Sequence, residues 1–212
     1  LRDLPSGKVA GPLVYTSGLG FTHPKGHPIA QPILNRPATP DEARAMVRGL
    51  AAEKADFVKI WVESKYGSLP KISREVQFAI VDEAAKTGLR VVAHIFEESD
   101  LRYLVNLGVR DILHTVRDAE PTAALMNYVK SQNVCFSPTL SVIDANWYLA
   151  ENAAAFEQEK NKAAASESVR SRLSDPEARK EILANQDIPM LKKELERAQR
   201  SPSGPTAARG MS

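Results

Sequence analysis

Cysteine is nearly absent from this sequence, and the features of several other protein classes are missing with it. Cys135 is the only cysteine among the 212 residues, so the chain can form neither an internal disulfide nor a thiolate metal cluster. No apolar run reaches the ~18 residues that a membrane-spanning helix needs. Acidic and basic residues nearly balance, at 26 and 28, and no basic block recurs with interleaved aromatic residues. We therefore expect no membrane and no nucleic acid among the partners.

A glycine-rich phosphate loop is also missing, because no such loop follows any of the apolar stretches. This absence weakens a nucleotide-binding interpretation of the chain. The hydrophobic and charged fractions, 43% and 25%, are those of an ordinary globular protein. The sequence opens at Leu1, with no initiator methionine and no signal-like segment, so we leave the localisation undetermined.

Short apolar stretches alternate with capped, amphipathic segments through the first two thirds of the sequence. The expected strands cover residues 57–62, 90–96, 111–116 and 134–140, and an earlier one covers residues 12–15 ahead of a Gly- and Pro-rich loop. Helices are expected to begin at Thr39, which heads a capping box with Glu42, and then at Ser73, Ser99 and Pro121. Such alternation predicts parallel βα units, in either a barrel or an open doubly wound sheet.

The composition changes beyond about residue 143, where Ala, Glu, Lys and Arg dominate. We therefore expect residues 1–142 to form the β/α domain and residues 143–200 a helical segment, in which Asp175-Pro176-Glu177 restarts a helix. Residues 201–212, rich in Ser, Pro and Gly, are expected to form a flexible tail.

Two histidines and a lysine lie within three successive predicted strands. Because successive side chains of a strand point to opposite faces, we expect positions 57, 59 and 61, then 92, 94 and 96, and then 112, 114 and 116 to share one side of the sheet. Lys59, His94 and His114 would then converge near the carboxyl ends of the strands. In β/α barrels this is the end that holds the active site.

Each of these three side chains also has a purely structural explanation. A histidine within a strand is commonly a hydrogen-bonded core residue, and Lys59 can reach the strand end or pair with an acid. Their occurrence in register on consecutive strands favours a shared divalent metal instead, since imidazole suits zinc. An unpaired buried ammonium is costly, and a neutral lysine amine can react with carbon dioxide to give a carbamate, whose oxygens are metal ligands.

Three stretches that end on or near these residues resemble the amidohydrolase superfamily, and most of all its imidazolonepropionase-like and prolidase-type metal-dependent hydrolases. They are Ala55–Trp61, Gly88–His94 and Gly108–His114. Phe136–Leu140 is similar to the seventh barrel strand of that branch, and Gly18–Pro28 is similar to the loop after its third. The resemblance covers about residues 11–143.

The resemblance implies a (β/α)8 TIM-type barrel, of which this chain would hold about strands three to seven, followed by a C-terminal helical segment. It implies one or two divalent metal ions, zinc first, held by a carbamylated Lys59 with His94 and His114. The activity it implies is hydrolysis of C–N bonds in amides, cyclic amides or dipeptides by a metal-activated water. His27 is expected to face a small-molecule substrate over the barrel mouth, and a solvated loop histidine is the equal alternative.

The sequence departs from the family pattern at both ends of the barrel. The His-x-His pair of strand one has no match, because His23 and His27 are spaced differently. The aspartate of strand eight, the expected general base, has no match either: Asp144, Asp175 and Asp187 all lie in charged, helix-like sequence. No catalytic residue is therefore assigned, and we expect an internal fragment that is inactive alone.

Two alternatives stay open beside the hydrolase. The chain could be a catalytically incompetent barrel fragment, stabilised by dimerisation or by a partner that covers its open sheet edges. It could also be a small-molecule-binding α/β module in which the histidines coincide by chance. A homo-oligomer is compatible with each of these alternatives.

Overall fold

The computed structural model describes residues 11–29, 31, 33–139, 148–152 and 166–184, together with eight single positions between 154 and 196. It divides into two compact units. The first is Leu1–His114 with Ala123–Ser137, and the second is Thr115–Thr122 with Pro138–Ser212. The domain boundary expected at residue 142, the tail over residues 201–212, Asp144 and Asp187 all lie outside the described residues.

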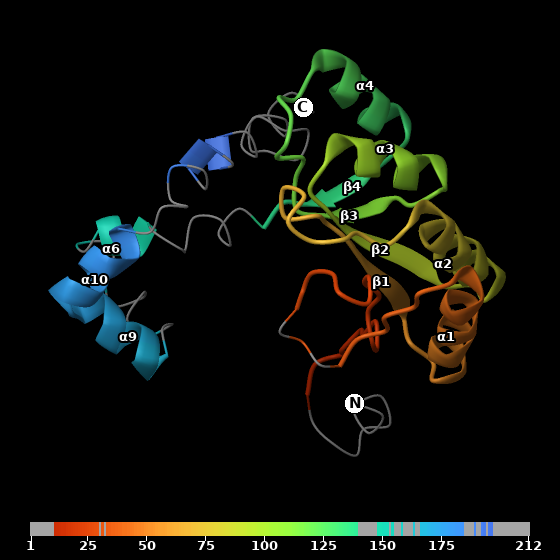
Figure 1. Ribbon diagram of the computed structural model, residues 1–212, viewed down its shortest axis with the longest axis horizontal. Helices are drawn as coiled ribbons and strands as arrows, with labels where there is room; N and C mark the ends of the chain where they lie inside the picture. The colour runs from red at the N-terminus through yellow and green to blue at the C-terminus, as the bar shows by residue number, and fades with distance from the viewer. Residues whose placement is uncertain are drawn as a thin grey trace. The chain divides into compact units, whose positions relative to one another are not determined.

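The first unit is built on a four-stranded parallel sheet in the order β1-β2-β3-β4 (Figure 1). The strands are β1 (Phe57–Val62), β2 (Arg90–Ile95), β3 (Asp111–Leu113) and β4 (Cys135–Ser137). The helices around them are α1 (Pro40–Ala52), α2 (Arg74–Lys86), α3 (Glu98–Asn106) and α4 (Ala123–Ser131). Each strand lies beside the next along the chain, which confirms the parallel βα architecture that the alternating pattern predicts.

The helix boundaries follow from local capping chemistry. The Thr39 hydroxyl accepts a hydrogen bond from the Glu42 amide, and the Glu42 carboxylate accepts from the Thr39 amide, so the predicted capping box is confirmed. Ser73 caps α2 in the same way by accepting from the Val76 amide. Gly88 and Gly108 follow α2 and α3 with φ values of 75° and 99°. These left-handed positions turn the chain into β2 and β3 at little steric cost, because glycine has no Cβ.

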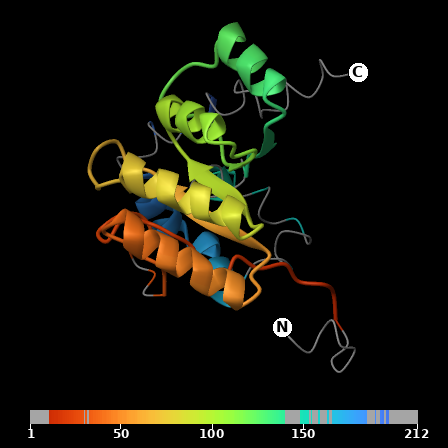
Figure 2. The same cartoon turned by 90° about the vertical axis from the view of Figure 1, so that its right-hand side faces the viewer.

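The register of β1 and β2 divides the sheet into an apolar face and a mixed face. Val58, Ile60 and Val62 pair with Val91, Ala93 and Ile95, and all six are at most 7% exposed. The helices cover this apolar face (Figures 1 and 2), where the fully buried Ile80 of α2 and Leu104 of α3 belong to the core. Burial of one such side chain stabilises the fold by about 1.5–3 kcal/mol. The opposite face of β1 and β2 carries Lys59, Trp61, Val92 and His94.

Four expected strands differ from the structure. The second ends at Ile95 rather than residue 96, and the third ends at Leu113 rather than residue 116. The fourth covers 135–137 rather than 134–140, of which residue 140 lies outside the described residues. The strand expected over residues 12–15 is wrong: Leu13 and Tyr15 are each 71% exposed and pair with no strand. Phe21 takes that place beside β1 instead. Its amide donates to the Lys59 carbonyl at 2.7 Å, and its carbonyl accepts from the Trp61 amide at 2.8 Å.

The second unit contains three short helices in its described residues: α6 (Tyr148–Glu151), α9 (Glu167–Ser174) and α10 (Pro176–Leu183). Asp175 caps α10 by accepting from the Glu177 amide, and Pro176 is its first residue, so the predicted helix restart is confirmed. Ala150 and Leu173 form a small core against Leu149 and Ile182. Among the described residues of both units, no helix has the length and apolar character needed to span a membrane.

We predict opposite sensitivities for two neighbouring apolar residues of α2. Ile80→Ala removes a side chain with no exposure and should lower the free energy of unfolding by about 2–5 kcal/mol, since it leaves a cavity under the helix. Phe78→Ala, at a position that is 49% exposed, is the matched control and should cost less than about 1 kcal/mol. Urea denaturation followed by circular dichroism measures both, and equal losses would contradict the packing described here.

Candidate functional site

Four polar side chains meet at the carboxyl ends of β1, β2 and β3. The Oε2 atom of Glu63 lies 2.5 Å from Nε2 of His94 and 3.7 Å from Nε2 of His27. The rings of His94 and His114 pack edge to face, with centroids 4.4 Å apart, and the rings of His27 and His94 are 5.9 Å apart. The structure therefore brings together His94, His114 and His27, three residues that the sequence singles out, around a carboxylate that the sequence analysis did not identify.

Lys59 lies on the same face of the sheet, deeper along β1. Its register partner is Val92, and Trp61, two residues further on, pairs with His94, so strand spacing puts the Cα atoms of Lys59 and His94 about 8 Å apart. The Lys59 ammonium lies over the Trp61 ring, 4.9 Å from its centroid. The lysine side chain thus runs along the strand toward the end where the histidines lie.

Lys59 is 7% exposed and, among the described residues, has no carboxylate partner. Burial lowers the pKa of its ammonium to about 7, since desolvation penalises the charged form. The alternative that Lys59 pairs with a neighbouring acid is therefore wrong within the described part of the chain. Among the described residues, its ammonium contacts the face of the Trp61 ring.

The expectation that residues 112, 114 and 116 share the side of Lys59 and His94 is wrong for Ile112, and His114 reaches the site by a turn of the backbone instead. Leu113 pairs with His94, and Ile112 pairs with Ala93 and is 1% exposed, so Ile112 belongs to the apolar face. Alternation alone would then send His114 to that face as well. Instead β3 ends at Leu113, and His114 adopts a left-handed φ of 70°, which is uncommon for a residue with a Cβ. This backbone turn brings its ring against that of His94.

Glu63 is the site residue that the sequence analysis missed. It follows β1 directly, and alternation from Lys59 and Trp61 already places it on their face of the sheet. Its side chain has no exposure. Burial alone would raise the pKa of this carboxyl, but the hydrogen bond from His94, the charge that His94 carries when it is protonated, and Lys65 at 3.1 Å outweigh burial and hold the pKa at about 2. The sequence feature that indicates Glu63 is its place as an acidic residue directly after an apolar strand.

The loop that carries His27 is held by hydrogen bonds that two side chains donate to its backbone carbonyls. The Arg36 guanidinium donates to the carbonyls of His23 at 2.9 Å, Gly26 at 3.3 Å and Pro28 at 2.7 Å. The Thr22 hydroxyl donates to the His27 carbonyl at 2.5 Å. Arg36 and Thr22 thus fix the backbone on both sides of His27. The His27 side chain remains 28% exposed at the edge of the cluster.

A charged network joins the loop after β1 to the loop after β2. The Lys71 ammonium lies 2.5 Å from Glu97 Oε2 and 2.8 Å from Asp100 Oδ2. The Ser64 hydroxyl donates to the other oxygen of Glu97 at 2.7 Å and accepts from the Gly67 amide. Because Ser64 adjoins Glu63, this network fixes the carboxylate of the site relative to β2.

The described residues fit a metal ion only if Lys59 takes part. Among them, no group of three His, Cys, Asp or Glu side chains is placed so that it could hold an ion by itself. The site does supply two imidazoles in contact and a buried amine that lacks an acidic partner. A metal here therefore depends on Lys59 as an oxygen-bearing carbamate, which is the ligand that the resemblance implies.

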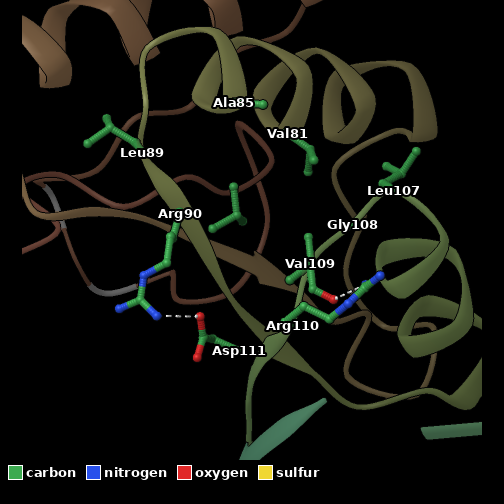
Figure 3. Close-up of a pocket in the computed structure, with 10 residues that line it drawn as sticks. Val81, Ala85, Leu89, Arg90, Leu107, Gly108, Val109, Arg110 and Asp111 are labelled. Carbon is green, nitrogen blue, oxygen red and sulfur yellow. Dashed lines mark hydrogen bonds and ion pairs between the residues drawn. The ribbon is translucent and has the colours of Figure 1, made fainter. Parts of the chain in front are cut away.

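A hollow of about 310 Å³ lies at the opposite, amino-terminal ends of β2 and β3. Figure 3 shows Val81, Ala85 and Leu107 on its walls, and an ion pair of Arg90 and Asp111 at 3.3 Å on its rim. None of the clustered histidines lines it. In β/α barrels this end serves stability rather than catalysis, so the hollow is not the candidate site.

Comparisons with known proteins agree on the fold. No protein-family model matches this chain. Over 67 residues it is 39% identical to an uncharacterized protein of Mycobacterium tuberculosis, a match that covers 31% of this chain and 18% of that protein. The chain thus spans less than a fifth of the length of the curated relatives that it matches.

Solved structures extend the likeness over most of the chain. Ochratoxinase of A. niger superposes with a TM-score of 0.62 at 18% identity, covering 94% of this chain and 46% of that one. An amidohydrolase superposes with a TM-score of 0.58 at 22% identity, covering 93% and 49%. A Xaa-Pro dipeptidase with bound methionine superposes with a TM-score of 0.57 at 23% identity, covering 71% and 41%.

These likenesses confirm the amidohydrolase resemblance at the level of the fold. The chain has an α/β fold with a parallel sheet, similar to the barrel folds of these hydrolases. It spans less than half the length of each solved structure.

We predict that Gly20 is required for the position of Trp61 over Lys59. A Cβ at Gly20 would lie 3.0 Å from Trp61 Cη2, nearer still to Cζ3, and 3.2 Å from Lys59 Cγ. Gly20→Ala should therefore destabilise the fold by about 1–3 kcal/mol, as overpacking does, and change the near-ultraviolet circular dichroism of tryptophan.

Gly49→Ala provides the matched control, because a Cβ at this position in α1 would meet nothing within 4 Å. Alanine is the better helix former, so this variant should be stabilised by about 0.5–1 kcal/mol. The two substitutions are thus expected to have opposite signs in the same denaturation experiment. A neutral Gly20→Ala would contradict the packing of Gly20 against Trp61.

Proposed function

We propose that this chain carries the central metal-binding part of a hydrolase that cleaves C–N bonds. The observation that carries the proposal is the contact of the His94 and His114 rings, 4.4 Å apart, on the sheet face that also buries Lys59. The fold shared with amidohydrolase and dipeptidase structures supports it. The location supports it too, since the carboxyl ends of parallel barrel strands are where such folds place their chemistry.

The three histidines of the cluster, Lys59 and Trp61 have distinct roles in this proposal. Lys59, His94 and His114 hold one or two divalent ions, zinc first, because imidazole nitrogen and carboxylate-like oxygen suit such metals. When bound, the metal supplies a Lewis acid that activates water and polarises a carbonyl. Trp61 holds the lysine stem in line with the strand, and His27 contacts the substrate from its loop at the rim of the site.

The substrate is proposed only as a class: a small molecule with an amide, cyclic amide or dipeptide bond. A Xaa-Pro dipeptidase and an ochratoxinase share this fold, so closely similar scaffolds act on different molecules. Specificity in barrels is set by the loops at the carboxyl ends of the strands. In this chain the described parts of those loops include residues 22–29 and 63–73, together with the residues that follow β2 and β3.

A non-catalytic metal-binding piece is the second candidate, and one observation favours it. Asp175 is the only aspartate after β4 among the described residues. It caps α10 and is not part of a strand. The proton acceptor expected of a complete hydrolase thus has no counterpart there. Zinc binding without turnover of any dipeptide or cyclic amide would favour this second candidate.

We predict that zinc binding to the full 212-residue chain depends on the three proposed ligands. With bicarbonate present to form the carbamate, Lys59→Ala, His94→Ala and His114→Ala should each lower the zinc stoichiometry measured by equilibrium dialysis. Each removes one donor from an incomplete set, which cannot bind an ion tightly with two protein ligands.

His23→Ala is the matched control, because His23 lies in the same loop as His27 but its Nδ1 accepts from the Lys25 amide, away from the cluster. This variant should keep the wild-type stoichiometry. Unchanged zinc binding in Lys59→Ala or His94→Ala would contradict the ligand assignment, and a loss in His23→Ala would show binding outside the site.

A further inference from the structure

Glu63 occupies the centre of the cluster, and the proposed ligand set leaves it without a role. Its Oε2 atom is 2.5 Å from His94 Nε2 and 3.7 Å from His27 Nε2, and its Oε1 atom is 3.1 Å from the Lys65 ammonium. Of these two imidazole contacts, the one with His94 has hydrogen-bond length and the one with His27 does not. The carboxylate has no solvent exposure, so this contact is made in a low-dielectric setting where it is strong.

We infer that Glu63 is a positioning residue that holds His94 in the tautomer with its proton on Nε2. A carboxylate oxygen can only accept, so the nitrogen that faces it must be the donor. In the neutral ring the lone pair then resides on Nδ1, and Nδ1 becomes the nitrogen that His94 offers to a metal. This last step rests on the proposed function, whereas the tautomer follows from the contact with Glu63.

The contact of Glu63 with His94 is of a kind that is common in metal sites. Histidine ligands commonly donate their second ring N–H to a carboxylate, which fixes the ring orientation and raises the basicity of the ligating nitrogen. Among the described residues, the ring that Glu63 contacts at hydrogen-bond distance is that of His94. His94 is therefore the ligand whose orientation this carboxylate determines.

The loops on both sides of the contact are fixed independently of it. Ser64, next to Glu63, donates to Glu97, three residues after His94, and the Leu69 amide donates to the Ser64 carbonyl. Lys65 and the next two residues all have left-handed backbones, with φ values of 49°, 57° and 83°. This turn brings the Lys65 ammonium back onto the carboxylate, so that Glu63 is oriented by more than its bond to His94.

NMR of isotope-labelled imidazole nitrogens in the metal-free full chain tests the tautomer directly. The spectrum is recorded at rising pH until the imidazole shifts stop changing, so that the neutral rings are observed, and His94 is assigned by comparison with His94→Gln. The expected result is a protonated Nε2 and an unprotonated Nδ1. A proton on Nδ1 alone, or on both nitrogens, would overturn the inference, and this holds whether or not any variant folds.

Two substitutions of Glu63 distinguish a role in positioning His94 from a role in stability alone. Glu63→Gln keeps an amide oxygen that can accept from Nε2, so it should preserve the tautomer. Glu63→Leu removes the acceptor, and His94 should then show shifts averaged between the two tautomers. Glu53→Leu, an exposed change at the end of α1, is the control and should leave the spectrum unchanged. A Glu63→Leu variant that retains the wild-type tautomer would also overturn the inference.

Zinc affinity measured on the same variants distinguishes this inference from the proposed function. Glu63→Leu should weaken binding by about 10–100-fold, as loss of an outer carboxylate does, and Glu63→Gln by less. Wild-type affinity in Glu63→Leu would overturn the role of Glu63 toward a metal. If the wild-type chain binds no zinc, the proposed function fails, while the spectrum of the metal-free chain still decides the tautomer.

Discussion

The parallel register of β1 and β2 is the constraint on which the rest of the first unit depends. It aligns Ile60 with Ala93 on one face and Trp61 with His94 on the other. A shift of one residue would exchange the faces, exposing Ile60 and turning Lys59 into the apolar core. The burial that stabilises the sheet and the convergence of the polar site are therefore set by the same pairing.

The site inherits its rigidity from loops that carry no metal ligand. Arg36 gathers the carbonyls around His27, and Lys71 joins Glu97 to Asp100 across the ends of β1 and β2. Each uses one cation to satisfy several oxygens, which is how irregular backbone avoids unpaired polar groups near a core. Precise placement of a few side chains at the rim thus depends on residues that do not face the site.

The sequence predicts the regular parts of this fold well because their signals are local. Capping at Thr39 and Ser73 and the apolar run of β1 determine elements without knowledge of their neighbours. Strand alternation also places Lys59 on the functional face. Strand alternation does not predict the position of His114, because its left-handed backbone follows the end of β3. The sequence also does not predict which segment pairs with the free edge of β1, because the tertiary fold decides that Phe21 rather than residues 12–15 lies there.

Lys59 gives the strongest energetic reason to regard the mixed face as a functional site. Its interaction with the Trp61 ring is worth about 0.5–2 kcal/mol, whereas burial of an unpaired ammonium costs several kcal/mol. A methionine or leucine would pack against Trp61 without that cost, so structure alone does not account for a lysine here. Its burial on the sheet face that also carries His94 is typical of a metal or substrate site, because such sites keep groups that destabilise the fold.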